Sequence, residues 1–189
     1  MPRVGLTPQV VVTEAAAVAD EVGLDKLTLA AVAKRCGVSL PGLYKHVDGL
    51  DAVKRDISVL AVRELTAKLA AATSGVSGKE ALQALSVSYR DYAMAFPGRY
   101  SASVRAPAAG DREHEEVAVQ AVGVIDTALK GYQLEGADLI HAVRIWRIVC
   151  HGLASLEAEG GFGLPDPVDE TFNRLIGVLD ASFRTVTVE

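Results

Sequence analysis

Two short helical segments that meet at Gly37 limit the possible folds more than any other part of this sequence. Thr28 is a typical helix N-cap residue, and the apolar side chains at 29, 32, 33 and 36 lie on one face of a helix from Leu29 to Cys36. Ser39 is the N-cap of a further helix, from Leu40 to about His46. The sequence therefore predicts two short helices in immediate succession.

The residues between these segments suit a close crossing of two helices. Ala33 is small enough for a second helix to pass over it, and Gly37 can adopt the positive φ that a tight turn requires. We expect Val38 to pack beneath the turn and Leu43 to contact the preceding helix. Two short helices joined by a turn of three or four residues that contains glycine form a helix-turn-helix, and we predict one here.

The rest of the chain also shows helix signals. No segment has a sustained alternation of apolar and polar residues, which predicts an all-α fold without a sheet. We expect helices from Pro8 to about Val22, from Asp51 to about Ala72, from a capping box at Ser77–Glu80 to near Phe96, from about Arg112 to Lys130, from about Glu135 to Glu159 and from Asp166 to near Val186.

Composition excludes several classes of protein. About half of the 189 residues are hydrophobic, which allows a sizeable core and excludes disorder along most of the chain. The longest stretches without a charged residue, 4–13 and 69–78, are much shorter than the roughly 20 apolar residues of a membrane-spanning helix. The apolar start is too short for a signal peptide. Because two cysteines, Cys36 and Cys150, are too few for a secreted disulfide scaffold, we expect a cytoplasmic protein with no membrane contact.

Positive charge is concentrated in one segment of an otherwise acidic chain. The formal net charge is −5, which by itself argues against binding to nucleic acid. Between residues 26 and 55, however, Lys and Arg at 26, 34, 35, 45, 54 and 55 outnumber Asp at 48 and 51, so this segment has a net charge of +4. The predicted helix-turn-helix lies inside it.

The second helix of this motif has the side chains that reading DNA requires. A major groove about 12 Å wide admits one helix, and this one would expose Leu40, Pro41, Tyr44, Lys45 and His46. Lys45 and His46 can donate hydrogen bonds to phosphate or to base acceptors, Tyr44 can reach phosphate and sugar, and Leu40 and Pro41 can touch thymine methyl groups. Thr28 and Ser39, at helix starts, are natural phosphate contacts, and Lys34 and Arg35 add positive potential. Pairs of short helices also occur in proteins that do not bind DNA.

The motif resembles the N-terminal domain of TetR-family transcriptional regulators. The match is Leu27-Thr28-Leu29-Ala30-Ala31-Val32-Ala33-Lys34-Arg35-Cys36-Gly37-Val38-Ser39, followed by Leu43-Tyr44-Lys45-His46-Val47. It covers roughly residues 7 to 56. The resemblance implies a three-helix DNA-binding domain at 1–56 and a helical effector-binding and dimerisation domain at 57–189.

Three positions depart from the pattern of that family. Val47 stands where the family usually has Phe, which keeps the apolar character but loses volume. Leu50 stands where the family often has a Lys that contacts phosphate, so this role shifts to Lys45 and Lys54. Gly42 replaces a small hydroxyl residue or Ala, which leaves only its backbone for a phosphate contact.

The C-terminal part resembles one subgroup of that family, the Trp-His-Gly type. The resemblance rests on Phe96-Pro97-Gly98-Arg99-Tyr100, on Trp146-Arg147-Ile148-Val149-Cys150-His151-Gly152-Leu153 and on Gly160-Gly161-Phe162-Gly163-Leu164-Pro165. It implies a pocket for a small-molecule effector. The candidate pocket residues are Tyr89, Tyr92, Phe96, Trp146 and His151.

Each of these candidates has an alternative interpretation. The aromatic residues Tyr89, Tyr92 and Phe96, with Met94 beside them, can equally be core. For both Trp146 and His151 a place in the core or the dimer interface is the more common interpretation, and His151 can also be read as a metal ligand. Cys150 fits either a buried inert thiol or a redox switch.

The last two predicted helices each have an apolar stripe at spacings of three and four residues. Joined by a short Gly/Pro turn, they predict an antiparallel hairpin whose apolar surface a two-fold dimer can bury. The candidate dimer contacts are Leu153, Leu156, Phe172, Ile176, Leu179 and Phe183.

No pattern in the sequence indicates catalysis, a cofactor or a bound metal. There is no nucleophile elbow or phosphate loop, and His114-Glu115-Glu116 lacks the spacing of a zinc motif. We therefore expect a homodimeric, ligand-responsive transcriptional regulator that binds double-stranded operator DNA, most simply a repressor released by a small apolar molecule. The alternative is a helical ligand-binding or interaction protein whose DNA-reading part has lapsed.

Overall fold

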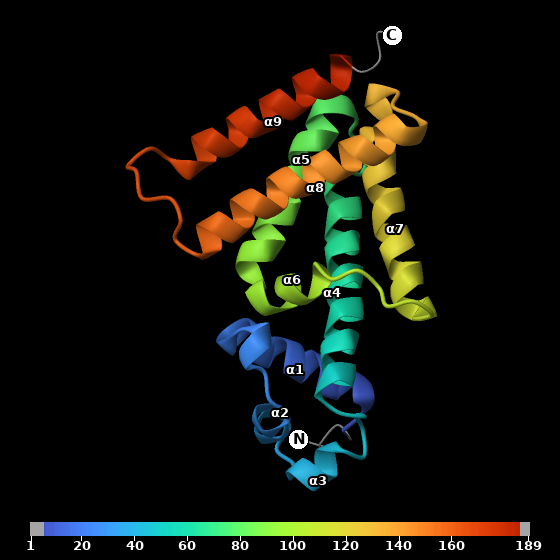
Figure 1. The fold of residues 1–189 in the computed structure, drawn as a ribbon, viewed down its shortest axis with the longest axis vertical. Coiled ribbons are helices and arrows are strands. Elements are labelled where there is room, and N and C mark those ends of the chain that lie inside the picture. The colour runs from blue at the N-terminus through green and yellow to red at the C-terminus, as the bar shows by residue number, and fades with distance from the viewer. Residues whose placement is uncertain (1–5, 186–189) are drawn as a thin grey trace. The chain divides into compact units, whose positions relative to one another are not determined.

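The computed structural model describes residues 6–185, and within that range every regular element is a helix. The order is α1 (Pro8–Val22), η1 (Leu24–Lys26), α2 (Leu29–Cys36), α3 (Leu40–Leu43), α4 (Leu50–Ala72), α5 (Gly78–Ala95), α6 (Pro97–Ser103), α7 (Arg112–Leu129), η2 (Lys130–Tyr132), α8 (Gly136–Ala158) and α9 (Val168–Thr185). Figure 1 shows these helices in chain order. The prediction of an all-α fold is confirmed.

The chain divides into two compact units, each with its own contacts. Unit 1 consists of the described part of 1–64 together with 96–118, and unit 2 consists of 65–95 together with the described part of 119–189. Helices α4 and α7 each contribute residues to both units.

The core of unit 1 is built from the apolar faces of α1, α2 and the first half of α4. Val11, Val32, Leu43 and Ile57 are completely shielded from solvent there. Thr7 caps α1 by accepting a hydrogen bond from the backbone N–H of Val10, at 3.3 Å. These contacts bring the short helices α2 and α3 against α1 and α4.

Helix α6 packs on α1 through a glycine. Gly98 is buried, and a Cβ atom there would overlap the backbone carbonyl of Ala19. The backbone N–H of Arg99 donates to Asp20 Oδ1 at 2.9 Å, which fixes the same contact from the polar side. Only glycine allows these two backbones to approach so closely.

Unit 2 is organised around α5, which contacts both α8 and α9. Figure 1 shows α8 and α9 side by side, joined by a loop over residues 159–167. The ring of Tyr132 meets that of Phe183 edge to face, with centroids 5.6 Å apart. Arg90 of α5 donates from Nε and Nη2 to the carboxylate of Glu157 at 2.7 and 2.6 Å. Most of the apolar stripe residues of α8 and α9 are therefore buried within a single chain, and Leu156 is an exception.

Some element boundaries differ from the prediction. Helix α3 ends at Leu43, and residues 44–46 continue as a turn, with the His46 N–H donating to Leu43 O at 2.9 Å. Gly42 explains the early end, because glycine is a poor helix former. Helix α6 was not predicted, since its seven residues are too few to show a periodic pattern. Val186, the predicted end of the last helix, lies outside the described residues.

Helix α8 is long and apolar enough to cross a membrane by length and composition alone. The sequence analysis looked for long stretches without a charged residue and therefore did not identify α8. Trp146, Cys150 and Leu153 of α8 are buried in unit 2, whereas Ile145 and Ile148 on the same helix are exposed.

We predict that Gly98→Ala destabilises unit 1, because the new methyl group must displace the α1 backbone. The expected loss in the free energy of unfolding is about 3 kcal/mol or more. Gly123→Ala is the matched control, since Gly123 is helical and a Cβ there meets no neighbour. It should stabilise the protein by up to about 1 kcal/mol. Equal melting temperatures for the two variants in thermal denaturation would contradict the α1–α6 contact.

Candidate nucleic-acid interface and ligand groove

The turn between α2 and α3 has the predicted conformation. Gly37 adopts φ +69°, and the N–H of Val38 donates back to Ala33 O at 3.0 Å. Ala33 is 3% exposed, as a close helix crossing requires. Leu43 and Val47 are buried on the two sides of a segment in which Tyr44 and Lys45 are exposed and His46 is half-buried, so α3 and the following turn are attached to the core through Leu43 and Val47.

The predicted DNA-reading side chains lie on the surface of unit 1. Tyr44 is 56% exposed and Leu40 is 39% exposed. Pro41 and Lys45 are also exposed, and His46 is half-buried. No described residue pairs with the Tyr44 hydroxyl or the Lys45 ammonium group. The side chains needed to touch DNA are therefore accessible.

Thr28 and Ser39 are the N-caps of α2 and α3. Each hydroxyl oxygen accepts a hydrogen bond from its own helix, from Ala31 N at 3.2 Å and from Gly42 N at 3.3 Å. The hydroxyl proton of each remains available to donate to a phosphate. Both side chains are exposed.

The structure divides the basic residues of segment 26–55 into paired and unpaired groups. Arg35 donates to Glu14 Oε2 at 3.0 Å and to Glu21 Oε1 at 2.5 Å on α1. Arg55 pairs with Asp56, Asp111 and Glu113, with Nε 2.7 Å from Asp111 Oδ2. These two arginines are therefore largely neutralised.

Within residues 6–185, the charges of three lysines in the same segment are not offset by a neighbouring carboxylate. Among the described residues none forms an ion pair with Lys34, Lys45 or Lys54. Lys34 and Lys45 are exposed and Lys54 is half-buried. The positive potential of the candidate interface thus comes from lysines. A count of charges along the sequence does not separate these lysines from the arginines that are paired with carboxylates.

Two of the predicted ligand residues form a buried pair in unit 2. The rings of Tyr89 and Trp146 meet edge to face with centroids 5.2 Å apart. The indole Nε1–H of Trp146 donates to Ser86 Oγ at 3.0 Å. Trp146 has no exposed surface and Tyr89 is 4% exposed. In this structure they pack as core residues.

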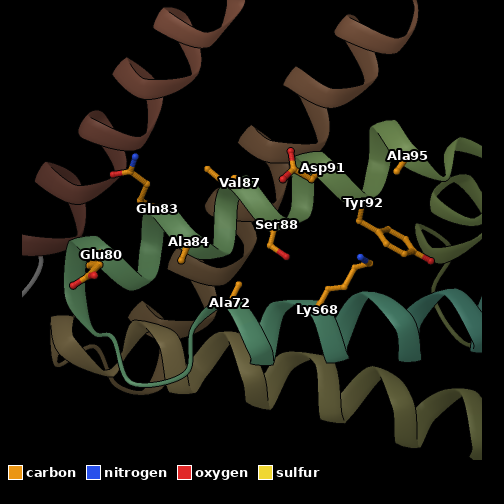
Figure 2. Close-up of a pocket in the computed structure, with 10 residues that line it drawn as sticks. All are labelled: Lys68, Ala72, Glu80, Gln83, Ala84, Val87, Ser88, Asp91, Tyr92 and Ala95. Carbon is orange, nitrogen blue, oxygen red and sulfur yellow. The ribbon is translucent and has the colours of Figure 1, made fainter.

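A groove in unit 2 runs between α4 and α5. Its volume is about 620 Å³, which is within the usual range for small-molecule sites. Figure 2 shows Lys68 of α4 rising towards Tyr92 of α5, while the Asp91 carboxylate lies on the other side of the α5 ribbon in this view. Alanine and valine side chains line the middle of the groove, and Glu80 and Gln83 lie at one end. The complete lining is Lys68, Ala72, Glu80, Gln83, Ala84, Val87, Ser88, Asp91, Tyr92 and Ala95.

Tyr92 is the one predicted ligand residue that lines this groove. His151 is half-buried on α8, and Phe96 belongs to unit 1, where the Arg99 guanidinium lies 4.8 Å from its ring centroid. The five candidates therefore do not form one site. Sequence analysis missed the rest of the groove, although its α5 residues recur at spacings of three and four, as the face of one helix does.

The predicted dimer contacts fall into two groups. Leu153, Phe172, Ile176, Leu179 and Phe183 are each at most 4% exposed in the single chain, where they fill the core of unit 2. Leu156 is 52% exposed. On the same helix, Ile145 and Ile148 are 43% and 68% exposed. Positions 145, 148 and 156 follow helical spacing, so α8 has a second, outward apolar face that the sequence analysis overlooked.

The two cysteines differ in their environment. Cys150 is 1% exposed, and burial raises the pKa of its thiol to about 12. Cys36 is half-buried, and burial raises its pKa as well. Within residues 6–185 no cluster of His, Cys, Asp or Glu has the composition of a metal site.

Comparison with known proteins identifies the family. The N-terminal domain described as bacterial regulatory proteins, tetR family, matches residues 11–47. The domain described as tetracyclin repressor-like, C-terminal, matches residues 82–179. A Bacillus subtilis strain 168 protein, the uncharacterized HTH-type transcriptional regulator YobS, is 32% identical over 91% of this chain and 90% of its own length.

Solved structures share the fold. A protein of unknown function from Rhodococcus sp. RHA1 superposes with a TM-score of 0.77 at 22% identity, covering 96% of this chain and 97% of that one. A TetR variant from Acinetobacter baumannii AYE in complex with minocycline gives a TM-score of 0.69 at 22% identity, covering 97% and 99%.

The chain belongs to the TetR family of bacterial transcriptional regulators, whose members have a DNA-binding helix-turn-helix domain and a ligand-binding C-terminal domain. The resemblance inferred from the motif at 27–47 is confirmed.

We predict that a thiol reagent applied to the folded protein at pH 8 labels Cys36 at least about a hundredfold faster than Cys150, because the Cys150 thiol is buried and largely protonated. Mass spectrometry of the labelled protein gives both rates. Denatured protein is the control, in which the two cysteines should react alike. Equal rates in the folded protein would contradict the packing of α8 against α5.

Proposed function

We propose that this protein is a cytoplasmic, homodimeric repressor that binds operator DNA and releases it when a small, mainly apolar molecule binds to unit 2. The observation that supports this most directly is the exposed pair Tyr44 and Lys45, held between the buried side chains Leu43 and Val47. A surface tyrosine and lysine so firmly anchored suit contact with a rigid partner such as a DNA duplex. The proposal includes no cofactor, no membrane contact and no catalytic activity.

In this proposal α3 and the turn after it enter the major groove. Lys45 and His46 donate to phosphates or base acceptors, and Leu40 and Pro41 contact thymine methyl groups. The hydroxyl protons of Thr28 and Ser39 are donated to phosphates on the two sides of the motif. Lys34, Lys54 and the Tyr44 hydroxyl supply the remaining backbone contacts. Residues 1–56 would thus be the DNA-binding domain.

Residues 57–189 would bind the effector and form the dimer. We place the dimer contact on the outward face of α8, through Ile145, Ile148 and Leu156, together with Val178 of α9, which is 65% exposed. The stripe predicted earlier, Leu153 with Phe172, Ile176, Leu179 and Phe183, would support that face from beneath. A two-fold axis there would present two copies of α3 to successive major grooves, about 34 Å apart.

The effector would occupy the α4–α5 groove. Alanine and valine side chains suit an apolar molecule, while Lys68 and Asp91 can orient a polar group on it. Trp146, His151 and Gly152 lie on α8, as a C-terminal domain of the Trp-His-Gly type would require. Because α4 contributes to both units, we propose it as the element that couples the groove to DNA binding. Effector and DNA would then weaken each other's binding by the same factor.

The DNA contact is tested by Lys45→Ala and by Tyr44→Ala. We expect Lys45→Ala to weaken binding to a selected operator and to reduce the slope of log affinity against log salt by about 0.9, the value for one lost phosphate contact. Fluorescence anisotropy at several salt concentrations measures both quantities. Lys130→Ala removes an exposed lysine of unit 2 and should change neither. A wild-type affinity independent of salt would favour a ligand-binding protein with a lapsed DNA-binding domain.

The dimer is tested by Ile148→Glu. Because Ile148 is already 68% exposed in the single chain, this change should leave folding intact while placing a charge in the proposed interface. Sedimentation equilibrium should show the dimer dissociation constant raised at least tenfold. Val119→Glu alters a side chain on α7 that is 72% exposed and should leave the dimer unchanged. Dimerisation unaffected by Ile148→Glu would place the interface elsewhere.

A further inference from the structure

Unit 1 contains a pocket that is smaller than the α4–α5 groove and to which the proposed function assigns no ligand. Its volume is about 230 Å³, and it lies among η1, the first turns of α4, the end of α6, the loop after α6 and the start of α7. We call it the His114 pocket. Its lining is Leu24, Asp51, Lys54, Arg55, Ser58, Ala102, Arg105, Ala106, Ala108, Asp111 and His114.

The charged groups of this pocket leave a positive excess. Arg55 and Asp111 pair with each other, and the arginine lowers the pKa of the Asp111 carboxyl to about 2. Lys54 and Arg105, by contrast, have no ion-pair partner among the described residues, and Asp51 is the only lining carboxylate without one. Two unpaired cations therefore face one unpaired anion.

A buried imidazole adds a polar atom to the wall of the pocket. Ser58 Oγ donates its proton to Ala102 O at 2.9 Å and lies 3.1 Å from His114 Nε2. Because the serine proton is already donated, Nε2 must donate to Ser58. His114 is only 4% exposed, and no described residue forms a hydrogen bond with its Nδ1. Nε2 thus fixes the ring in place, and Nδ1, which is the acceptor nitrogen of this tautomer, is left to accept a proton from a ligand.

The size of the pocket limits what it can hold. A volume of about 230 Å³ is below the usual range for drug-sized ligands, which starts near 300 Å³. It equals the liquid volume of about eight water molecules, at about 30 Å³ each. A small oxyanion fits these limits, because its acceptor oxygens match the ammonium and guanidinium donors and a hydroxyl group on it can donate to Nδ1 of His114.

We infer that the His114 pocket binds a small oxyanion that carries a hydroxyl group, of the hydrogen phosphate class, with Lys54 and Arg105 donating to its oxygens and Nδ1 of His114 accepting from its hydroxyl. Such binding has a consequence for DNA. Lys54 is also one of the side chains that we propose for the DNA backbone, so an anion in the pocket competes with the operator for the same ammonium group. This consequence rests on the proposed function, whereas anion binding itself does not.

Anion binding is tested by calorimetric titration of the full-length protein with inorganic phosphate, with ionic strength held constant by sodium chloride. We expect saturable binding of one phosphate per chain. Arg105→Gln and Lys54→Gln should each raise the dissociation constant at least tenfold. Lys130→Gln, which removes an unpaired surface lysine far along the chain, should not change it. Both pocket variants alter side chains outside the core and should fold normally.

His114→Gln tests the buried imidazole that accepts from the anion, with a thermal melt to verify folding. Absence of saturable binding, or equal weakening by Arg105→Gln and Lys130→Gln, would overturn the inference, because either result is what non-specific screening produces.

A second measurement separates free phosphate from the phosphates of DNA. Operator affinity of the wild type should fall when chloride is replaced by phosphate at constant ionic strength, while that of Arg105→Gln should not respond. If Arg105→Gln already loses DNA affinity in buffer without phosphate, Arg105 serves the DNA backbone and the proposed competition is overturned, while the calorimetric titration still decides whether the pocket binds an anion. If the wild type binds no DNA in either buffer, the proposed function fails, and the calorimetric titration still decides whether the pocket binds an anion.

Discussion

The burial of Leu43 and Val47 fixes the position of α3 and of the turn after it, the segment that we propose enters the major groove. Helix α3 has only four residues, too few to be stable alone, so its orientation depends on these two side chains and on the turn at Gly37. Burying one such apolar side chain contributes about 1.5–3 kcal/mol. That contribution holds Tyr44 and Lys45 at the surface in one conformation. Val47 is smaller than the Phe that the family usually has at this position. It is nevertheless buried, with 8% of its surface exposed, and so it can still hold the turn against the core.

In the N-terminal segment, arginines link helices through ion pairs, whereas lysines remain without such partners among the described residues. Arg35 ties α2 to α1 through Glu14 and Glu21, while Arg55 ties α4 to the start of α7 through Asp111 and Glu113. A guanidinium group can bind two carboxylates at once, which suits it to linking helices. The lysines are left unpaired, and an ammonium group on a flexible stem suits contact with phosphates. The acidic chain as a whole and its basic DNA-binding face are therefore compatible.

Sequence reasoning was strongest where one residue type meets a local requirement. Thr7, Thr28 and Ser39 are caps because their hydroxyls can accept a backbone N–H, and all three do so. It was weakest at close approaches between distant segments. Nothing near Gly98 in the sequence reveals that the backbone of Ala19 lies against it. Trp146 and Tyr89 were assigned to a possible ligand site, yet each fills the core of unit 2, because hydrophobicity does not reveal which apolar face of a helix its neighbours cover.

The sequence by itself determined the all-α class, the helix-turn-helix and the family, because caps, glycine turns and helical periodicity are properties of neighbouring residues. Tertiary structure alone decided which cations remain unpaired, that the α4–α5 groove and the His114 pocket exist, and that α8 has an outward apolar face. Those features depend on side chains from segments 40 to 60 residues apart, such as Ser58 and His114 or Ser86 and Trp146. Contacts of that kind arise only when the helices pack, since local sequence does not record which surfaces meet.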